Sequence, residues 1–348
     1  MTATWTVNET AWPGGGIAIV KPPGYPAFAY GVLSDDIWVG RDTWGLLPAS
    51  GSGYGVGQHT GNPAIFMVDH LEGYIGCGTQ RKILHTLDGW QTIDDTIDVS
   101  VGGVPRSAHV VFAFGSTIWA ADVYNGQVLR STDYGASWTM VFEATDDNFT
   151  KDLYVESASE AWFCWKESWD GNYESIVHLE HTVNGGSDWT TTTWSGVNDL
   201  TYMDGYGDLL VITPWWGNNG RGPGYHWHFK VSTDGGANWL DRQLEKEIIT
   251  PIWEELNTIS DVSVTETGEI YLASNYGSIF KSVDTGLNWE RISGPDIYNG
   301  INNNFYQIAA GHGMIVAADN SLVMSYAGEM SDDEPKVFMN NNQLWSPL

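Results

Sequence analysis

The chain has 348 residues, of which 42% are hydrophobic, so a large buried core is possible and a disordered composition is excluded. Its 43 acidic residues against 15 basic ones give a net charge of −28, which repels phosphate backbones and excludes nucleic acid as an expected partner. No apolar run approaches the roughly 18 residues of a membrane span, so no membrane insertion is expected. The acidity fits either an ordinary solvated surface or a halophilic protein, in which salt screens repulsion between carboxylates.

The first residues and the cysteines indicate the compartment. Residues 1–7 lack a basic region followed by an apolar one, so we expect no secretory signal. This expectation leaves two alternatives, an intracellular protein or one that leaves the cell without a signal, such as a component of a virus particle. Cys77 and Cys164 each lie in an apolar stretch, which favours buried free thiols over a disulfide.

An eight-residue pattern, Ser/Thr-x-Asp/Asn-x-Gly-x-x-Trp, recurs along the chain, and we call each occurrence a box. A degenerate first box at residues 86–93 has Trp90 at the glycine position and Ile93 at the tryptophan position. The four full boxes occupy residues 131–138, 182–189, 232–239 and 282–289, and their first residues are 51, 50 and 50 positions apart. Such a period predicts a repeat architecture.

The residue types of a box predict a tight turn. The Asp or Asn side chain can accept hydrogen bonds from loop amides, and glycine adopts a backbone conformation that other residues disfavour. We expect each box to join two strands and its Trp to fold back between neighbouring sheets, burying on the order of 200 Å². Around the box at 131–138, β-rich runs at 109–113, 117–121 and 127–130 precede it and one at 139–142 follows. Four antiparallel strands per repeat predict a propeller blade.

The signature of a second strand recurs seven times, at residues 36–39, 73–76, 117–120, 161–164, 208–211, 269–272 and 313–316. The predicted fold is therefore all-β, a single propeller of seven four-stranded blades spanning residues 1–348. The last blade has a third strand at 321–324 but no box. Because the start of the chain resembles the segments that follow boxes, we expect residues 1–12 to supply the outer strand that closes this blade. A run at 336–339 in the C-terminal tail, 330–348, competes for that position.

The boxes resemble those of the Asp-box (bacterial neuraminidase repeat) family of β-propellers. That superfamily includes sialidases, xyloglucan-cleaving glycosidases, sortilin-type receptors and photosystem II assembly factors, so the fold alone does not give the function. The resemblance implies that each box lies between the third and fourth strands, on the face opposite the usual ligand site. It therefore assigns a structural role to Asp88, Asp133, Asn184, Asp234 and Asp284.

Two long insertions favour a binding site on that opposite face. They follow the second strands of adjacent blades, at residues 165–174 and 214–228, and are rich in aromatic residues among Gly and Asn. Such surfaces stack sugar rings or anchor partner proteins. The expected ligand-binding residues are Trp165, Trp169, Tyr173, Trp215, Trp216, Arg221, Tyr225 and Trp227. The alternative is that these aromatic side chains only pack the insertions together.

No motif selects a catalytic centre. The Phe/Tyr-Arg-Ile-Pro segment usual in sialidases is absent, although Arg41, Arg81, Arg106 and Arg221 map to the loop face. Other glycosidases need two carboxylates across a cleft, and nothing singles out a pair among Glu167, Asp170, Glu174, Glu254 and Glu255. His226 and His228 lack an evident third ligand, so no metal is expected, and no cofactor motif is present.

These observations favour a non-catalytic binding or scaffold protein over an enzyme. We expect an accessory or host-attachment component of a virus particle or viral tail, which contacts surface glycans or another structural protein. The expected location is the virion or the extracellular space without a signal peptide, with the cytoplasm as the alternative. Two other functions stay open: a glycoside hydrolase using the same loop face, and an assembly factor of the photosystem kind.

Overall fold

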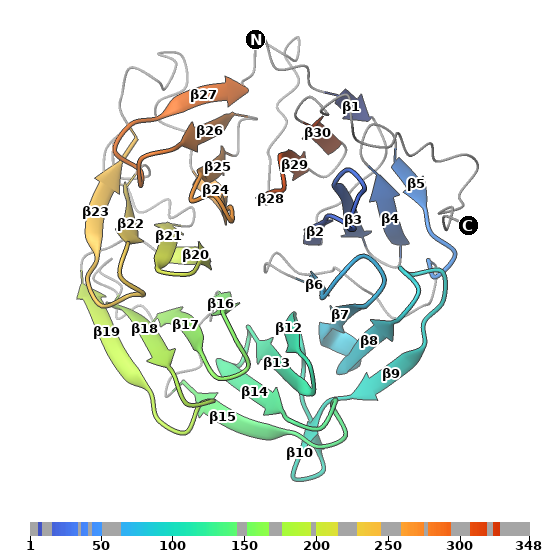
Figure 1. Cartoon of the computed structure of the whole chain (residues 1–348). Helices are drawn as coiled ribbons and strands as arrows, with labels where there is room; N and C mark the ends of the chain where they lie inside the picture. Colours follow the sequence, from blue (N-terminus) through green and yellow to red (C-terminus); the bar gives the residue numbers. More distant parts are fainter. Residues whose placement is uncertain are drawn as a thin grey trace.

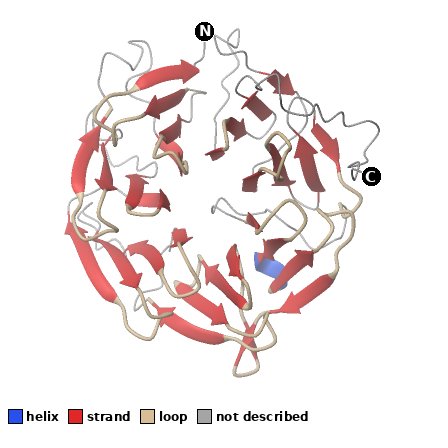
Figure 2. Ribbon diagram, in the orientation of Figure 1, coloured by secondary structure: helices blue, strands red, loops and turns tan. Residues whose placement is uncertain are grey.

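The computed structural model describes residues 6–8, 16–33, 36–40, 44–50, 64–144, 152–166, 176–195, 200–214, 228–244, 259–274, 278–293, 307–318 and 323–327. These residues are almost entirely strands and turns, with one short 3-10 helix, η1 (Gly78–Gln80) (Figure 2). The sheets are arranged in a ring (Figure 1). The protein is thus an all-β propeller, as the sequence predicts.

The described strands form seven four-stranded antiparallel sheets and one two-stranded ribbon. The first sheet comprises β2 (Gly16–Val20), β3 (Phe28–Leu33), β4 (Asp36–Gly40) and β5 (Trp44–Leu46). The second comprises β6 (Ile65–Met67), β7 (Gly73–Cys77), β8 (Lys82–Thr86) and β9 (Asp95–Asp98). The third comprises β12 (Val110–Phe114), β13 (Thr117–Asp122), β14 (Gln127–Ser131) and β15 (Thr139–Glu143). The ribbon comprises β10 (Ser100–Val101) and β11 (Val104–Pro105), between the second and third sheets in the chain.

The next three sheets follow the same plan. The fourth sheet comprises β16 (Asp152–Val155), β17 (Ala161–Lys166), β18 (Ile176–Thr182) and β19 (Thr190–Ser195). The fifth comprises β20 (Leu200–Tyr206), β21 (Leu209–Pro214), β22 (His228–Ser232) and β23 (Leu240–Gln243). The sixth comprises β24 (Ile259–Val264), β25 (Ile270–Ser274), β26 (Ile279–Ser282) and β27 (Glu290–Ser293). The seventh sheet comprises β28 (Gln307–Gly311), β29 (Met314–Ala318), β30 (Val323–Ala327) and, at its outer edge, β1 (Thr6–Asn8).

The first strand of every sheet faces the middle of the ring, and the fourth lies at the rim (Figure 1). Successive first strands are neighbours all the way round, and β28 lies against β2, so the ring is closed. The N-terminal strand contributes to this closure because β1 pairs antiparallel with β30, with Thr6 opposite Ser325. This pairing agrees with the expected N-terminal closure. The competing run at 336–339 lies outside the described residues, as do the tail 330–348 and much of 1–12.

Six of the seven predicted second strands occupy the second position of their sheets. The prediction for residues 36–39 is wrong, because β4 is the third strand of the first sheet and β3 is the second. The second and third strands of a blade are both interior and both covered on two faces. A short apolar run therefore does not reveal which of the two it is.

Each box is a turn between the third and fourth strands of its sheet, as predicted. In the third sheet, Asp133 Oδ1 accepts hydrogen bonds from Ser131 Oγ and from Ser137 N, both at 2.8 Å. Ser131 Oγ in turn accepts one from Gly135 N at 2.8 Å. The same bonds recur around Asp88, Asn184, Asp234 and Asp284. These hydrogen bonds lower the pKa of Asp133, Asp234 and Asp284 below the ordinary value. Each of the five predicted box residues thus accepts hydrogen bonds within its own turn.

The box turn of one sheet packs against the preceding sheet. Gly135 has a φ of +86°, and a Cβ there would lie 2.4 Å from Ile97 Cγ2 on β9. At Gly186, which has a φ of +82°, a Cβ would lie 2.6 Å from Val141 Cβ on β15. Glycine is therefore required both by the backbone conformation and by the close approach of the neighbouring sheet.

The box tryptophans fill the space between sheets, as expected. Trp189 donates its Nε1 hydrogen to Val141 O of the third sheet at 2.9 Å. The ring of Trp289 lies 5.4 Å from that of Phe229 in the fifth sheet. Since these contacts join neighbouring sheets, each box fixes the position of its own blade against the one before it.

The degenerate box keeps this contact with a different arrangement. Trp90 stands at the glycine position with a φ of +64°, and its backbone N–H still donates to Thr86 Oγ1 at 3.0 Å. Its side chain is fully buried in the core shared with the first sheet, which also includes Leu47. Ile93, at the tryptophan position, is partly buried against the same core. The tryptophan thus stands at the glycine position and a smaller apolar residue at the tryptophan position, and both pack in the core between the sheets.

Carboxyls on the first strands link neighbouring sheets near the axis, and of these Asp152 and Asp261 are fully buried whereas Asp204 is half-buried as a residue. Asp152 Oδ2 accepts from Met203 N of the next sheet at 2.8 Å, and Asp261 Oδ2 accepts from Ile308 N at 2.8 Å. Between them, Asp204 Oδ2 accepts from Val264 N at 2.7 Å. Burial raises the pKa of Asp204 to about 7, and it also raises the pKa of Asp152.

We expect Trp90→Gly to lower the free energy of unfolding by several kcal/mol, since removing a fully buried Trp typically costs about 3–5 kcal/mol. Adding Ile93→Trp should restore part of the loss, because the double variant has the residue pattern of the four full boxes. Urea denaturation of the two single variants and the double variant measures this. A double variant no more stable than Trp90→Gly would contradict the proposed exchange of positions.

Asp204 predicts a pH dependence of stability. The folded-state pKa of about 7 lies above the ordinary 3.8, so the folded chain binds this proton more tightly than the unfolded chain does. The contribution of Asp204 to the free energy of unfolding is therefore greatest below pH 3.8 and decreases as the pH rises to about 7. Denaturation curves of wild type, Asp204→Asn and the exposed control Asp208→Asn should show this decrease removed only in Asp204→Asn. An unchanged pH dependence in Asp204→Asn would count against the assignment.

Candidate functional site

The aromatic residues predicted to bind ligand lie mostly outside the described residues. This applies to Trp169, Tyr173, Trp215, Trp216, Arg221, Tyr225 and Trp227, for which the prediction stands. Trp165 is the last but one residue of β17, and its side chain is only 6% exposed. Its indole Nε1 donates to Glu180 Oε1 at 2.9 Å, and its ring stacks on His178 at 4.0 Å. Trp165 is therefore buried against β18 and is not part of an exposed surface.

The arginines considered for an anion clamp are only partly described. Arg41 and Arg221 lie outside the described residues. Arg81 follows η1 and is exposed, whereas Arg106 is partly buried and donates from Nη1 to Gln127 Oε1 at 3.2 Å. A cluster of three arginines is not formed by the described part of the chain, and the sialidase interpretation gains no support from these two.

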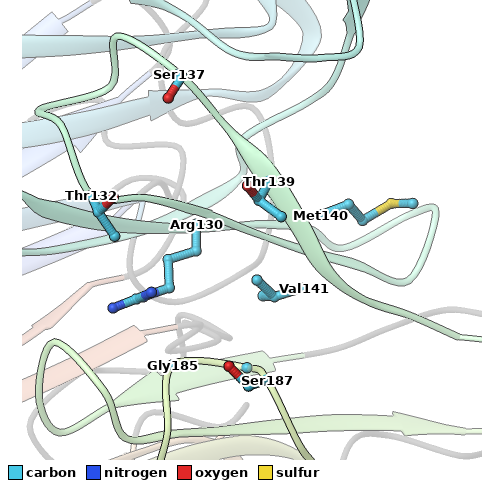
Figure 3. Close-up of a pocket in the computed structure, with 9 residues that line it drawn as sticks. Arg130, Thr132, Ser137, Thr139, Met140, Val141, Gly185 and Ser187 are labelled. Atoms are coloured by element: carbon cyan, nitrogen blue, oxygen red, sulfur yellow. The ribbon is translucent and has the colours of Figure 1, made fainter.

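A groove of about 380 Å³ lies between the third and fourth sheets at their box turns. Its lining comes from β14, from the box turn of the third sheet, from β15 and from the box turn of the fourth sheet (Figure 3). The lining residues are Arg130, Thr132, Ser137, Thr139, Met140, Val141, Gly185, Gly186 and Ser187. Figure 3 shows Val141 and the Arg130 side chain on the side of β15 that faces Gly185 and Ser187, with Met140 extending away.

Arg130 is the charged residue of the groove. Its Nε and Nη2 both donate to Ala158 O, in the turn between β16 and β17, at 3.2 and 2.8 Å. The guanidinium carbon lies 5.2 Å from the centroid of the Trp119 ring. Within the described part of the chain, the guanidinium forms no ion pair with a carboxylate. A cation held by a carbonyl and an aromatic face keeps its charge available to an anion in the groove.

The close approach of the fourth sheet fixes the guanidinium in place. A Cβ on Gly185 would lie 2.8 Å from Arg130 Cζ, so no larger residue fits there without displacing the side chain. Gly185 also has a positive φ of +72°. The box of the fourth sheet thus forms one wall of the groove and limits the positions open to the Arg130 side chain.

Two carboxylates in the adjoining turns oppose the binding of an anion. Asp133 directs its oxygens into its own turn, where Oδ1 and Oδ2 accept from the Ser137 backbone N–H and hydroxyl. Asp188 Oδ2 accepts from Asn184 Nδ2 at 2.9 Å. Neither Asp133 nor Asp188 forms an ion pair with Arg130, and each accepts hydrogen bonds within its own turn.

Sequence reasoning missed this groove. It placed ligand binding on the opposite face, and five of the groove residues, Thr132, Ser137, Gly185, Gly186 and Ser187, belong to boxes to which it assigned a structural role. The available signal was the basic residue immediately before the box at 131–138, but the sequence alone does not show that its side chain extends toward the next sheet.

The described residues contain no group of three or more His, Cys, Asp or Glu side chains placed to hold a metal ion. Cys77 and Cys164 are buried free thiols, as expected. No helix in the described ranges is long and apolar enough to cross a membrane.

Comparisons with known proteins place the fold. No family model matches the chain, and no curated protein sequence does either. Among solved structures, the chain is similar to YCF48 bound to a D1 peptide, with 16% identity and a TM-score of 0.64 over 93% of this chain and 95% of that one. It is also similar to YCF48 from Cyanidioschyzon merolae, with 14% identity and a TM-score of 0.60 over 93% of this chain and 99% of that one.

A third similar structure is the GH74 xyloglucanase from Xanthomonas campestris, with 14% identity and a TM-score of 0.60. The match covers 91% of this chain but only 53% of the xyloglucanase, so the chain spans about half the length of that enzyme. At such identities these similarities establish the propeller fold alone. One propeller with this fold is known with a bound peptide and another is a glycoside hydrolase.

Proposed function

We propose that this protein is a non-catalytic, seven-bladed Asp-box propeller that binds a partner polypeptide in the groove between its third and fourth sheets. Each four-stranded sheet is one blade in this interpretation. The observation that carries the proposal is the groove itself, in which Arg130 forms no ion pair with any carboxylate of the described residues, in a chain of net charge −28. Thr132, Thr139 and Ser187 also line the groove, and their hydroxyl groups can form hydrogen bonds with a peptide backbone.

The groove is built on rigid elements. Trp189 ties the fourth sheet to Val141 on the groove wall, and Arg130 is bonded to Ala158 of the fourth sheet. These two bonds join the walls of the groove across the boundary between the third and fourth sheets. Preorganisation of this kind reduces the entropy lost on binding.

The similarity to YCF48 bound to a peptide supports the proposal only as an example of the fold in such a role. The hydrolase alternative requires a pair of carboxylates, and the candidates Glu167, Asp170, Glu174, Glu254 and Glu255 lie outside the described residues. Glycan binding depends on the aromatic insertions, and the virion location depends also on the expected lack of a secretory signal, so both are a separate hypothesis. The groove requires neither of them.

A peptide selection tests the groove. Random peptides displayed on phage are selected on the wild-type protein and then measured against Ser187→Cys carrying a bulky maleimide, because Ser187 is exposed and lines the groove. We expect the selected peptides to lose binding to the labelled variant. Cys77 and Cys164 are buried, so the label should react at the introduced thiol.

Ala237→Cys with the same label is the matched control, because Ala237 is exposed at the equivalent position of the next box but does not line the groove. Retained binding to labelled Ala237→Cys, together with lost binding to labelled Ser187→Cys, supports the proposal. Equal binding to both labelled proteins would place the peptide site elsewhere.

The aromatic insertions make a separate prediction. If they form a ligand surface, Trp215→Ala with Trp216→Ala should abolish binding on a glycan array and change the melting temperature little. If they only pack the insertions together, the double variant should instead melt at a clearly lower temperature. Scanning calorimetry of the same preparation distinguishes the two.

A further inference from the structure

The residue that precedes a box forms part of a recurring arrangement. In the second sheet, Tyr74 and His85 lie directly opposite each other on β7 and β8, with their rings stacked at 4.4 Å. Glu72, two residues before the tyrosine, accepts from Tyr74 Oη at 3.0 Å and lies 3.5 Å from His85 Nε2. The arrangement consists of an aromatic ring, a basic residue opposite it and a glutamate beside both.

The fourth and sixth sheets repeat it. Trp162 lies opposite His181 with the rings 4.4 Å apart, and His181 Nε2 lies 3.0 Å from Glu160 Oε1. In the sixth sheet, Tyr271 and Lys281 are opposite each other, and Lys281 Nζ lies 2.6 Å from Glu269 Oε1. In all three sheets the glutamate stands two residues before the aromatic one and neutralises the cation when it is charged.

The fifth sheet has neither charge. Val211 lies opposite Val231 at these positions, and Leu209 stands where the glutamate would be. Cation and glutamate are therefore present together in three sheets and absent together in one. This correlation indicates that the carboxylate is the normal partner of the cation in this fold.

The third sheet departs from the rule. Trp119 lies opposite Arg130, but the residue two before the tryptophan is Thr117, which is buried and uncharged. No other described carboxylate replaces the missing glutamate. Arg130 instead extends across to Ala158 of the fourth sheet and borders the groove.

We propose that the partner polypeptide supplies the missing carboxylate, from an Asp or Glu side chain or from its C-terminus, and that this carboxylate binds the Arg130 guanidinium in the groove. This inference rests on the proposed function and specifies the chemistry of the ligand. The carboxylate completes in trans the arrangement that Glu72, Glu160 and Glu269 complete within the chain. At physiological ionic strength the Debye length is about 8 Å, so distant carboxylates of this acidic chain repel the ligand only weakly.

The test uses NMR titration at that ionic strength, with the backbone amide signals of Gly185 and Ser187 as reporters. The probes are acetyl-Gly-Gly-Glu-Gly-Gly-amide, its Gln analogue and acetylated pentaglycine with a free C-terminus. We expect saturable shifts with the Glu peptide or with the free C-terminus and none with the Gln analogue. The stronger of the two active probes identifies which source of carboxylate the site prefers.

Two variants remove the site by different routes. Arg130→Gln should weaken binding about tenfold or more, the size expected for loss of a charge-assisted hydrogen bond. Thr117→Glu should weaken it similarly by supplying the glutamate internally, while leaving the urea midpoint equal to or above that of wild type. Lys281→Gln is the matched control, because that cation already has its glutamate, and binding should be unchanged.

Several outcomes would overturn the inference: equal binding of the Glu and Gln peptides, insensitivity to Arg130→Gln, or tighter binding of inorganic phosphate than of any carboxylate probe. If Thr117→Glu does not fold, Arg130→Gln and Arg130→Lys decide the question, with the lysine variant retaining part of the affinity. Peptides that are blocked by the label on Ser187→Cys but do not depend on Arg130 would leave the proposed function intact and contradict only the carboxylate inference.

Discussion

The contact on which the ring depends is the one between a box turn and the sheet before it. Gly135 and Gly186 adopt a positive φ that allows the chain to turn, and the same lack of a side chain lets the turn touch Ile97 or Val141 of the preceding sheet. The tryptophan that follows fills the widening space toward the rim, as Trp289 does against Phe229. One short segment thus sets both the hairpin within a blade and the contact between neighbouring blades.

Aspartates hold the ring together at two radii, and their surroundings give them opposite electrostatic properties. Those of the boxes, such as Asp234, are exposed to water and accept several hydrogen bonds, which lowers their pKa. Those on the first strands, such as Asp204, bind the amide of the next first strand but are removed from water, which raises their pKa. The box carboxylates therefore stabilise the fold when they are ionised. Ionisation of the carboxyls on the first strands destabilises the fold, because it places a charge where water is excluded.

Local patterns in the sequence were sufficient to predict the repeating parts of this fold. The turn chemistry of the boxes and the placing of their tryptophans depend on residues within eight positions of one another, and both were predicted correctly. The strand at 36–39 was assigned the wrong position, because two interior strands of a blade have the same apolar character. The groove and the burial of Trp165 could not be predicted, since they depend on how far Arg130 reaches toward Ala158 and on the pairing of Trp165 with Glu180, which join residues from different strands or sheets.

A repeat protein contains its own comparison set, and its departures from the repeat differ in kind. At the degenerate box, Trp90 and Ile93 have exchanged roles, so the same inter-sheet space is filled and the departure has only a structural consequence. In the third sheet, Thr117 stands at the glutamate position while the cation, Arg130, is still present. In the fifth sheet, by contrast, apolar residues, Val211 and Val231, stand at both the aromatic and the cation positions. Arg130 is held by Ala158 O and by the Trp119 ring, but within the described residues its charge has no carboxylate partner. Its presence beside a preformed groove is explained if the carboxylate comes from another molecule, and this is why the third sheet, rather than any other, is assigned the binding role.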